Sequence, residues 1–492
     1  IFLNNIGAKE NMLLKEVIDC ADKRLAELEI TGVTCDSREV KTGYAFVCIN
    51  GTASDGHLFA ASAVEKGAAV IIAERDTGEK NQIIVNDTHA AYSEICARWF
   101  GNPAKSLHLI GVTGTNGKTS TTYMIKKILE AAGHKVGLIG TIQNLIGDRQ
   151  IAAHNTTPNA YELNSLFALM KVEGCDYVIM EVSSHALDQR RVYGLDFDVA
   201  VFTNLTQDHL DYHKTMENYL EAKKKLFGMC KTAVINTDDA YAEKIIEGLS
   251  CKIVTYSTGD TSDYSAKGIN YHPASVDYEL VSNNGIRHIR VHTGGRFTVY
   301  NSLAAAVTAI VIGIDPATAA SALGSLEGVK GRAESVPCDL GFTVIIDYAH
   351  TPDGLKNILS TFSDCKKNRL IVVFGCGGDR DKTKRPIMGS IAVHNSDLAI
   401  ITSDNPRTED PMAIINDILE GVGGTGTPYK VIENRVEAIR YAIAIARQDD
   451  IIVLAGKGHE TYQILKTGTI HLDEREVVAK AFEDLKNGRL HI

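Results

Sequence analysis

The chain has 492 residues, of which 44% are hydrophobic and 23% are charged, with 42 glycines and only 10 prolines. This composition excludes a fibrous or intrinsically disordered protein, and the length predicts about three domains of roughly 150 residues each. The net charge of −10 at pH 7 argues against a general binder of nucleic acid or of anionic membranes.

Neither a membrane span nor a secretory signal is evident, since no apolar run approaches the roughly 20 residues that cross a bilayer. The 10 cysteines occur singly, without a C-x-x-C pair, and are expected to be reduced. Cys376 lies in a glycine-rich loop, where we expect it to pack rather than react. We therefore predict a cytoplasmic protein that acts as a monomer, with no nucleic-acid or membrane partner. Residues 1–11 could be an upstream extension and are left out of the fold prediction.

Residues 1–106 are predicted to form a small N-terminal α/β domain. Short strand-like runs at 44–49 and 68–73 are separated by helix-like segments and polar turns. Two loop segments carry side chains that could anchor a polar ligand, although the residues alone favour solvated turns. These side chains are Ser37, Arg38, Thr52, Ser54 and His57.

The most informative segment is GVTGTNGKTSTT at residues 111–122. Apolar residues at 107–112 predict a buried strand before it, and apolar residues at helical spacing predict a helix after it that ends at Gly133. This arrangement brings backbone N–H groups to phosphate oxygens at a helix N-terminus. Lys118 can neutralise the terminal phosphates, and the Thr119 hydroxyl can bind Mg²⁺.

The match to the general phosphate-loop pattern is loose, because that pattern requires glycine at position 112 and this chain has Val112. The alternative is a strand-to-helix turn with incidental glycines. The flanking strand and helix favour the nucleotide-binding interpretation.

Further apolar runs in residues 107–334 end in polar clusters, which predicts a mostly parallel, doubly covered sheet with ligands at its carboxyl edge. Glu181 ends one such run and is a sensible partner of Thr119 in a Mg²⁺ site, because magnesium prefers oxygen ligands. The alternative for Glu181 is an ion pair with Arg190 or Arg191. Asp208, His209 and Asp211 could form another metal or phosphate site.

The lysine run at 223–225, taken by itself, indicates a solvated helix face. A second α/β series follows in residues 335–492, where four apolar strands end in charged or glycine-rich loops. Because the carboxyl ends of such strands gather ligands, these loops are candidate binding residues.

The motifs, in their order along the chain, resemble those of the ATP-dependent Mur ligases of bacterial cell-wall synthesis. The resemblance covers essentially everything after Met12. It is carried by TGTNGKT, NTTP, EVSSH, DHLDYH, YLEAK, FTVYNSLAA, GRAE, DYAHTPD, GCGGDRDKTKRP, SDNPR and GKGHE.

The resemblance implies three α/β domains: a UDP-sugar-binding domain at 1–106, a central P-loop ATPase domain at 107–334 and a Rossmann-like, amino-acid-binding domain at 335–492. It implies ATP and two Mg²⁺ sites as cofactors, with a metal set of Thr119, Glu181, His209 and Lys223. Lys223 would be carbamylated, which overturns the solvated-face interpretation. Lys118 joins Glu181, His209 and Lys223 as catalytic residues. The implied ATP contacts are Gly114, Thr115, Asn116, Gly117, Lys118, Thr119, Ser120, Asn301, Arg332 and Asp347.

The implied substrate is UDP-N-acetylmuramoyl-L-alanyl-D-glutamate, whose glutamyl carboxylate would be activated as an acyl phosphate with release of ADP and phosphate. Arg191 can pair with a carboxylate through two hydrogen bonds. The positions that match this substrate site are Ser37, Thr52, Ala53, Ser54, Asn155, Thr156, Thr157, Ser183, Gln189 and Arg191.

The DNPR motif indicates meso-diaminopimelate as the amino acid that is added. Arg407 and Arg380 can pair with its distal carboxylate, while Glu460 and Asp404 can balance its ammonium. Lysine would place an ammonium against Arg407, with a like-charge penalty. The complete expected pocket is Arg380, Asp404, Asn405, Pro406, Arg407, Gly456 and Glu460.

Three alternatives remain open from the sequence. The first is a lysine-adding member of the same family, and the second is a related ligase such as folylpolyglutamate synthase. The third is a nucleotide-binding regulator without catalytic activity.

Overall fold

The computed structural model describes residues 11–51, 54–424 and 426–490. The chain divides into two compact units, which we call the first and second units. The first comprises Ile1–Ser257, Thr261–Asp263 and Ala304–Asp315, and the second comprises Thr258–Asp260, Tyr264–Leu303 and Pro316–Ile492. The three-domain boundaries expected from the sequence remain a prediction.

The first unit begins with a small four-stranded sheet in the order β3-β4-β5-β6, in which every neighbouring pair is parallel. Buried side chains of α4 pack on this sheet and complete its core. The strands and helices of this region are β1 (Met12–Leu13), α1 (Leu14–Val17), α2 (Lys23–Ala26), β2 (Glu29–Ile30), β3 (Gly32–Thr34), β4 (Tyr44–Val47), α3 (Ala60–Glu65), β5 (Val70–Ala73), β6 (Gln82–Ile84) and α4 (Thr88–Trp99).

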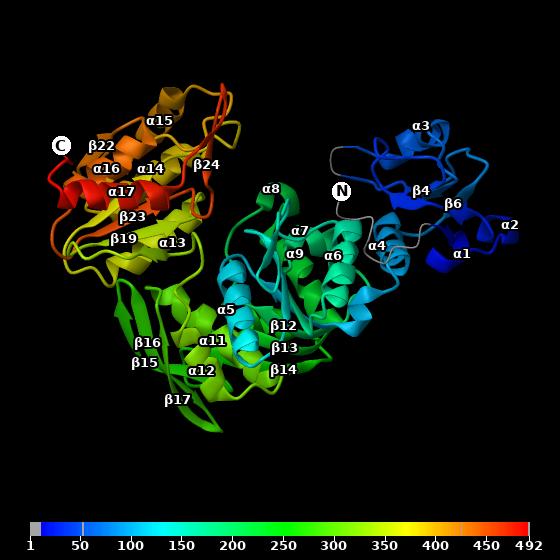
Figure 1. The fold of residues 1–492 in the computed structure, drawn as a ribbon, viewed down its shortest axis with the longest axis horizontal. Helices are drawn as coiled ribbons and strands as arrows, with labels where there is room; N and C mark the ends of the chain where they lie inside the picture. Colours follow the sequence, from blue (N-terminus) through cyan, green and yellow to red (C-terminus); the bar gives the residue numbers. More distant parts are fainter. Residues whose placement is uncertain (1–10, 52–53, 425, 491–492) are drawn as a thin grey trace. The chain divides into compact units, whose positions relative to one another are not determined.

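Eight strands of the first unit follow the order β10-β9-β8-β11-β7-β12-β13-β14 in the larger sheet. Figure 1 labels the last three of them, β12, β13 and β14. The six strands from β8 to β14 in that order are parallel to one another, whereas β9 pairs antiparallel with both β8 and β10. Its elements are β7 (His108–Thr113), α5 (Lys118–Ala131), β8 (Val136–Ile139), β9 (Asn144–Ile146), β10 (Arg149–Ile151), α6 (Ala160–Val172), β11 (Tyr177–Glu181), α7 (Ser184–Asp188), β12 (Phe197–Phe202), α8 (Leu210–His213), α9 (Met216–Lys224), β13 (Cys230–Asn236), α10 (Ala242–Ile246) and β14 (Lys252–Ser257).

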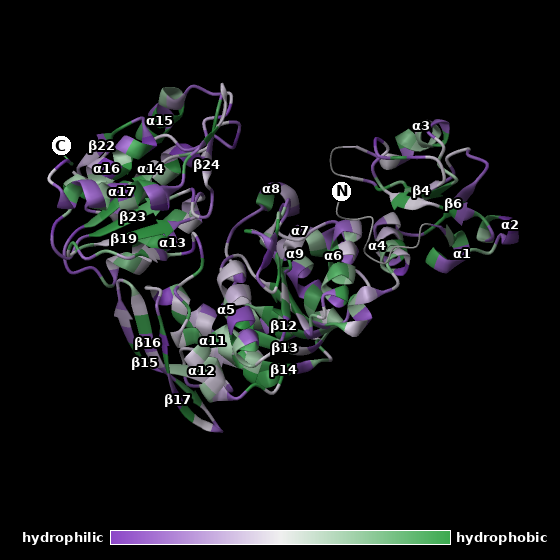
Figure 2. Cartoon of the chain, in the orientation of Figure 1, coloured by the Kyte–Doolittle hydropathy of each residue, from purple (hydrophilic) through white to green (hydrophobic). Residues whose placement is uncertain are grey.

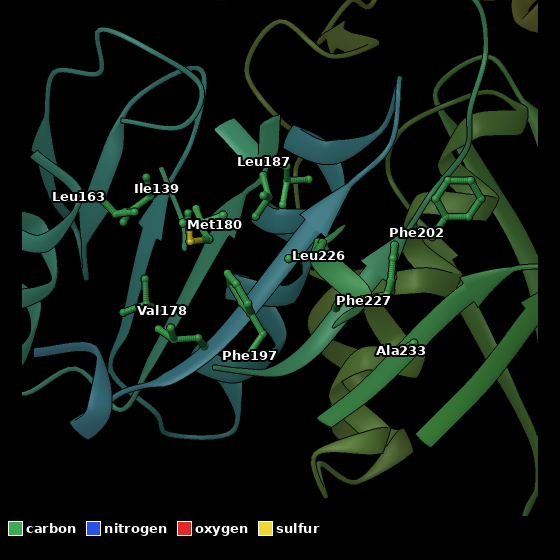
Figure 3. Close-up of a cluster of buried hydrophobic side chains, with 14 of the residues drawn as sticks. Ile139, Leu163, Val178, Met180, Leu187, Phe197, Phe202, Leu226, Phe227 and Ala233 are labelled. Atoms are coloured by element: carbon green, nitrogen blue, oxygen red, sulfur yellow. The ribbon is translucent and has the colours of Figure 1, made fainter. Parts of the chain in front are cut away.

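A large apolar cluster covers one face of this sheet. Side chains of β8, β11 and β12 pack there against α6, α7 and the turn that follows α9 (Figure 3). Because six neighbouring strands of this sheet are parallel, their carboxyl ends meet at one edge.

The second unit contains three neighbouring antiparallel strands, β15, β16 and β17, and a six-stranded sheet in the order β18-β19-β23-β20-β21-β22. All pairs in the six-stranded sheet are parallel except β18 with β19. The elements are β15 (Tyr264–His272), β16 (Ser275–Ser282), β17 (Gly285–Val291), α11 (Arg296–Val311, which continues into the first unit), α12 (Pro316–Gly324), β18 (Glu334–Val336), β19 (Thr343–Asp347), α13 (Pro352–Ser363), β20 (Leu370–Phe374), α14 (Lys384–Asn395), β21 (Leu398–Ile401), α15 (Pro411–Leu419), β22 (Tyr429–Val431), α16 (Arg435–Ala444), β23 (Ile451–Ala455), β24 (Tyr462–Leu465), β25 (Gly468–His471) and α17 (Glu474–Lys486).

Helices cover both faces of the six-stranded sheet. Alternate residues of β20 and β23 face α13, α14 and α15, and the intervening residues face α16 and α17. Its strands are therefore apolar on both sides, as the green colour of β19 and β23 in Figure 2 shows. The expected α/β class with mostly parallel sheets is confirmed. Across the described residues, every helix is too short or too polar to cross a membrane.

Candidate functional site

The phosphate-loop segment forms the predicted strand, turn and helix between β7 and α5. Gly117 caps α5 with φ of 87°, and Gly114 has φ of 149°. A Cβ atom on Gly114 would lie 1.9 Å from the Thr203 Oγ1 atom, so only glycine fits there. Two residues after β12 support the turn: Thr203 Oγ1 donates to Asn116 O at 2.7 Å, and Asn116 N donates to Asn204 Oδ1 at 2.9 Å.

Lys118 begins α5 and folds back over the turn, where its Nζ atom donates to Gly114 O and to Thr115 O, each at 2.9 Å. Thr115 is buried, and Ser120 is half-buried in the first turn of α5. The Lys118 ammonium and the N-terminus of α5 thus lie together, and both attract the negative charge of a polyphosphate.

Glu181 is fully buried at the end of β11 and is held by hydroxyl and amide donors. Its Oε2 atom accepts from Thr119 Oγ1 at 3.0 Å and from Thr141 Oγ1 at 2.9 Å, and its Oε1 atom accepts from Thr141 N at 2.8 Å. The alternative of an ion pair is wrong, because Arg190 pairs with Asp87 at 2.7 Å and Arg191 donates to uncharged acceptors.

Lys223 is also buried, with an exposed fraction of 1%. Its Nζ atom donates to Gly114 O at 2.8 Å and lies 4.5 Å from the centre of the Tyr219 ring. Burial, reinforced by the positive charge of Lys118, lowers the pKa of Lys223 well below its usual value. The solvated-face interpretation of the lysine run is therefore wrong for Lys223.

His209 precedes α8 in a left-handed conformation, with φ of 53°. Its Nε2 atom lies 3.4 Å from Asp208 Oδ2, and its ring lies 4.9 Å from the ring of His185. Burial lowers the pKa of His209, with further contributions from Lys118 and Lys223. Asp211 is exposed. The described part of the chain contains no group of three or more His, Cys, Asp or Glu side chains arranged around a metal site.

Four predicted substrate residues are joined by hydrogen bonds beside the end of β11. Thr157 Oγ1 donates to Glu181 O at 2.8 Å and accepts from Ser183 N at 3.0 Å. Arg191 donates to Thr157 O at 2.8 Å and, through Nη2, to Gln189 Oε1 at 2.7 Å. Burial lowers the pKa of Arg191, and no carboxylate within the described ranges forms an ion pair with it.

The remaining predicted residues of the first unit differ in setting. Thr156 Oγ1 lies 3.0 Å from Thr141 Oγ1, next to Glu181, whereas Asn155 is exposed. In the N-terminal sheet region, Ser37 is half-buried and Ser54 is exposed. Thr52 and Ala53 lie outside the described residues.

In the second unit, Arg332 and Asp347 lie close together. Asp347 accepts from Ala333 N at 2.7 Å and from Ala349 N at 2.8 Å, and burial raises its pKa. The Arg332 guanidinium lies 5.0 Å from the centre of the Tyr348 ring. The two backbone bonds hold Asp347 rigidly at the end of β19. Asn301 is buried in α11.

The loops after β21 and β23 form a polar cluster at the carboxyl edge of the six-stranded sheet. Asn405 Nδ2 donates to Glu460 Oε2 at 3.0 Å. Lys457, which is fully buried, donates to Asn405 Oδ1 and Glu460 Oε2, both at 3.0 Å. Asp404 Oδ1 accepts from Asn405 N at 2.6 Å, and its Oδ2 atom lies 4.0 Å from Arg435 Nη1.

Arg407 lies next to this cluster, and its Nη1 atom donates to Gly378 O at 2.8 Å. A Cβ atom on Gly377 would lie 2.9 Å from Arg407 Nη1 and 3.8 Å from Arg380 Cγ, so both arginines flank this glycine. Similarly, a Cβ atom on Gly456 would lie 2.7 Å from Asp404 Oδ2. The structure therefore brings the predicted amino-acid residues together, with Pro406 buried between them.

Comparison with known proteins gives matches along nearly the whole chain. Residues 29–99 match the catalytic domain model of the Mur ligase family, 112–309 the Mur ligase middle domain, and 331–458 the Mur ligase glutamate ligase domain. The UDP-N-acetylmuramoyl-L-alanyl-D-glutamate--2,6-diaminopimelate ligase of Clostridium botulinum is 48% identical, over 93% of this chain and 96% of the relative. The chain belongs to the Mur ligase family.

Further relatives and solved structures are similar to most of the chain. The enzyme of the same name from Bacillus velezensis is 49% identical over 93% of this chain and 95% of its own. A solved structure of a ligase with that name is 35% identical and has a TM-score of 0.74, covering 97% of this chain and 99% of that one. Folylpolyglutamate synthase of Mycobacterium tuberculosis, at 18% identity and a TM-score of 0.60 over 80% of this chain and 94% of its own, shares the fold.

Several residues of this Mur ligase site were missed from the sequence. Thr203 and Asn204 brace the phosphate loop, Thr141 holds Glu181, and Lys457 holds Asn405 and Glu460. Lys457 lies within the GKGHE motif, and its position at the polar end of a predicted strand is the signal that could have identified it. Thr141 follows a predicted apolar run in the same way. Nothing in the spacing of Thr203 and Asn204 indicates their contact with residue 116.

Proposed function

We propose that this chain is a MurE-type ligase, which joins meso-2,6-diaminopimelate to UDP-N-acetylmuramoyl-L-alanyl-D-glutamate at the expense of ATP. The observation that carries the proposal is the polar cluster at the ends of β20, β21 and β23. It joins the guanidinium of Arg407, which donates to Gly378 O, with the carboxylates of Asp404 and Glu460, which accept from Asn405. An amino acid with a carboxylate and an ammonium at its far end matches this charge distribution.

ATP binding is supported by the glycine turn at the N-terminus of α5, where Gly114 packs so closely against Thr203 that no larger residue can occupy its position. Lys118 would exchange its bonds to the backbone oxygens of the turn for the β- and γ-phosphates. In the second unit, Asn301, Arg332 and Asp347 are the proposed contacts with the rest of the nucleotide. These three assignments rest on the family resemblance.

The Thr119 hydroxyl and the Glu181 carboxylate, 3.0 Å apart, are oxygen donors of the kind that Mg²⁺ prefers. His209 is proposed for a second metal position. Mg²⁺ at these residues would withdraw charge from the transferring phosphoryl group. Lys223 as an ammonium does not fit a metal set, because it would repel the ion.

Carbamylation of Lys223 resolves this conflict. Its amine is buried without an ion pair in the described chain and donates to one backbone oxygen. The ammonium first loses a proton. Addition of CO₂ to the neutral amine then forms an N–C bond and releases a second proton, so that a cation is replaced by a carboxylate-like anion. That anion could bind Mg²⁺.

The sugar peptide is proposed to bind with its glutamyl carboxylate facing the phosphate loop. Arg191 is partly desolvated and bonded only to uncharged acceptors, so a carboxylate of the substrate would gain a charge-assisted pair there. Thr157 and Ser183 lie beside it, and the residues of the N-terminal sheet, Ser37 and Ser54, are proposed for the uridine diphosphate.

The proposed reaction has two steps. A carboxylate oxygen of the substrate attacks the γ-phosphorus of ATP, the bond to the β-phosphate oxygen breaks, and ADP leaves. The amine of diaminopimelate then attacks the acyl carbon, phosphate departs, and the amine loses a proton. Lys118 offsets negative charge during phosphoryl transfer, and the pocket around Arg407 orients the amine.

Each of the three alternative functions leaves one feature of the structure without a role. A lysine-adding MurE gains nothing from Arg407, which would face an ammonium. Folylpolyglutamate synthase leaves the N-terminal sheet region without a role, and a non-catalytic regulator leaves the buried Lys223 unexplained.

We further propose that the enzyme acts as a monomer in the cytoplasm.

The decisive experiment is incubation of the full chain with ATP, Mg²⁺ and the UDP-muramoyl dipeptide. Either meso-diaminopimelate or L-lysine is then added in separate reactions, and products are identified by mass spectrometry. We expect the diaminopimelate tripeptide and an equal amount of ADP. A product containing lysine, or ADP release that needs no amino acid, would refute the assignment.

A further inference from the structure

Two loops of the second unit carry the arginines of the proposed amino-acid pocket. We call residues 377–380, after β20, the GGDR loop, and residues 404–407, after β21, the DNPR loop. Gly378 N donates to Asn405 O at 2.9 Å, and Arg407 Nη1 donates back to Gly378 O at 2.8 Å. The direction of the Arg407 guanidinium therefore depends on where the GGDR loop places its backbone.

Each loop contains a non-glycine residue in the left-handed conformation. Asp379 and Arg407 both have φ of 53°. Such backbone persists where surrounding contacts enforce it, and it often marks a functional site. Asp379 also binds the residue after the DNPR loop, since Thr408 Oγ1 donates to Asp379 Oδ1 at 2.6 Å and Thr408 N donates to Asp379 Oδ2 at 3.2 Å.

Glu409 anchors both loops to the body of the unit, alongside a longer direct bond from Arg385 Nη2 to Gly377 O at 3.4 Å. Its Oε1 atom accepts from Asp379 N at 2.6 Å. Both of its oxygens also accept from the Arg385 guanidinium of α14, at 2.8 and 3.0 Å. The Arg385 side chain is 1% exposed, so it presents a fixed, two-pronged support to the carboxylate.

Glu409 remains ionised under all ordinary assay conditions. Its hydrogen bond to Arg385 lowers the pKa of the carboxyl group to about 2. A glutamine at this position would keep the size and one acceptor oxygen but would lose the charge. It would therefore weaken the bonds to Arg385 and to the Asp379 amide without removing the side chain.

We propose that Glu409 is a positioning residue for substrate selection: with Arg385 behind it, it locks the GGDR loop so that Arg407 faces the distal carboxylate of the amino acid. This inference rests on the proposed function. Glu409 itself does not touch the substrate. It acts through Asp379 N, Gly378 O and the guanidinium of Arg407, so its loss should weaken amino-acid recognition while leaving nucleotide recognition intact.

Asp417 provides a matched control within the same network. Its Oδ2 atom accepts from Arg385 Nη1 at 2.7 Å, so it also pairs with the buried arginine. It lies on α15, however, and it pairs with Arg385 rather than with either loop. Asp417→Asn therefore weakens the same ion-pair network without removing an acceptor from the GGDR loop.

The test compares Glu409→Gln and Asp417→Asn in the full chain, with phosphate release measured against each substrate. We expect Glu409→Gln to raise the KM for meso-diaminopimelate about tenfold, to change kcat by less than about threefold, and to leave the KM for ATP within about twofold. The ratio of kcat/KM for diaminopimelate to kcat/KM for lysine should fall in Glu409→Gln. Asp417→Asn should stay within about twofold of the parent chain in every constant.

Two further measurements separate positioning from a general loss of structure. In an Arg407→Gln background, Glu409→Gln should raise the KM by less than about a further twofold, since both changes remove one function. Hydrogen exchange of the Asp379 amide should accelerate in Glu409→Gln and remain slow in Asp417→Asn. An unchanged KM in Glu409→Gln, or equal effects of the two variants, would overturn the proposal.

The exchange measurement needs no catalysis, so it distinguishes this inference from the proposed function. If the parent chain released no phosphate with either amino acid, the proposed function would fail. Equal exchange at Asp379 in all three chains would instead refute the positioning by Glu409, whatever the activity.

Discussion

At the scale of single residues, Lys223 has the most unusual environment in the site. It is a buried cation that shares the Gly114 carbonyl with Lys118. Its sequence position in a lysine run indicates the opposite, a solvated side chain, and only the family resemblance corrected that interpretation. The local pattern could not reveal the burial, because α9 contacts α7, which precedes it by some 30 residues in the chain.

The carbamate hypothesis predicts chemical rescue at Lys223. Lys223→Ala should lower kcat by at least about 100-fold, since an anionic metal ligand would be lost. Added formate or acetate should restore part of the activity by occupying the vacated space. The rate of phosphate release against carboxylate concentration measures this effect. Full activity of the variant without added carboxylate would refute the role.

A useful control is Lys224→Ala, since the neighbouring lysine donates to Lys244 O at 2.8 Å on the surface. We expect this variant to keep its activity and to gain nothing from formate. Rescue of both variants would indicate a general effect of the added salt.

At the scale of elements, the strand, turn and helix of the phosphate loop could be predicted closely. The expected end of the helix at Gly133 agrees with α5, whose last residue is Ala131. The braces of the loop could not be predicted, because Thr203 and Asn204 reach it from β12, some 90 residues further along the chain. In the same way, the contact of Lys457 with Asn405 depends on the order of β21, β20 and β23, which single-strand patterns do not specify.

The turn should be intolerant of any side chain at Gly114, for a steric reason that goes beyond backbone conformation. Gly114→Ala places Cβ 1.9 Å from Thr203 Oγ1. We expect a loss of about 2 to 4 kcal/mol in the free energy of unfolding, from strain and overpacking together. Urea denaturation measures this change, and ATP binding should be lost as well.

Gly133→Ala is the matched comparison. This residue also has positive φ, at 91°, but an added Cβ would meet nothing within 4 Å. Only the conformational cost applies there, of roughly 1 kcal/mol. Equal destabilisation of the two variants would contradict the steric argument.

At the scale of the whole molecule, the sugar-peptide residues and the phosphate loop belong to the first unit. The amino-acid residues belong to the second unit, which also carries the proposed ATP contacts Asn301, Arg332 and Asp347. Arg407→Gln should raise the KM for diaminopimelate by about 100-fold, since a charge-assisted pair is lost. The affinities for ATP and for the sugar peptide, measured by calorimetry, should stay unchanged. A parallel loss of ATP affinity would contradict this prediction.

The stability of the full chain should decline in mild acid. Burial lowers the pKa of His213 and of His459 to about 4, whereas an unfolded histidine titrates near 6.5. Between these values the unfolded chain binds more protons than the folded chain. Stability is thus complete above about pH 6.5 and is lost progressively as the pH falls towards 4.

The pH dependence of the urea midpoint checks this prediction. His459→Asn should flatten the decline between pH 6.5 and 4, because one of the two histidines no longer titrates. His471→Asn, whose histidine side chain is 65% exposed, should leave the decline unchanged. A midpoint that rises towards pH 4 would contradict the sign of the effect.

The shared carbonyl of Gly114 has one more consequence. It accepts from Lys118 at 2.9 Å and from Lys223 at 2.8 Å, so one oxygen serves two competing donors. Phosphate would draw Lys118 away, and carbamylation would convert Lys223 from a donor of positive charge into an anion. Binding of ATP and uptake of CO₂ would then be thermodynamically linked, and reciprocity requires that each change the affinity for the other by the same factor. ATP affinity should therefore depend on bicarbonate concentration, through competition for a single backbone oxygen.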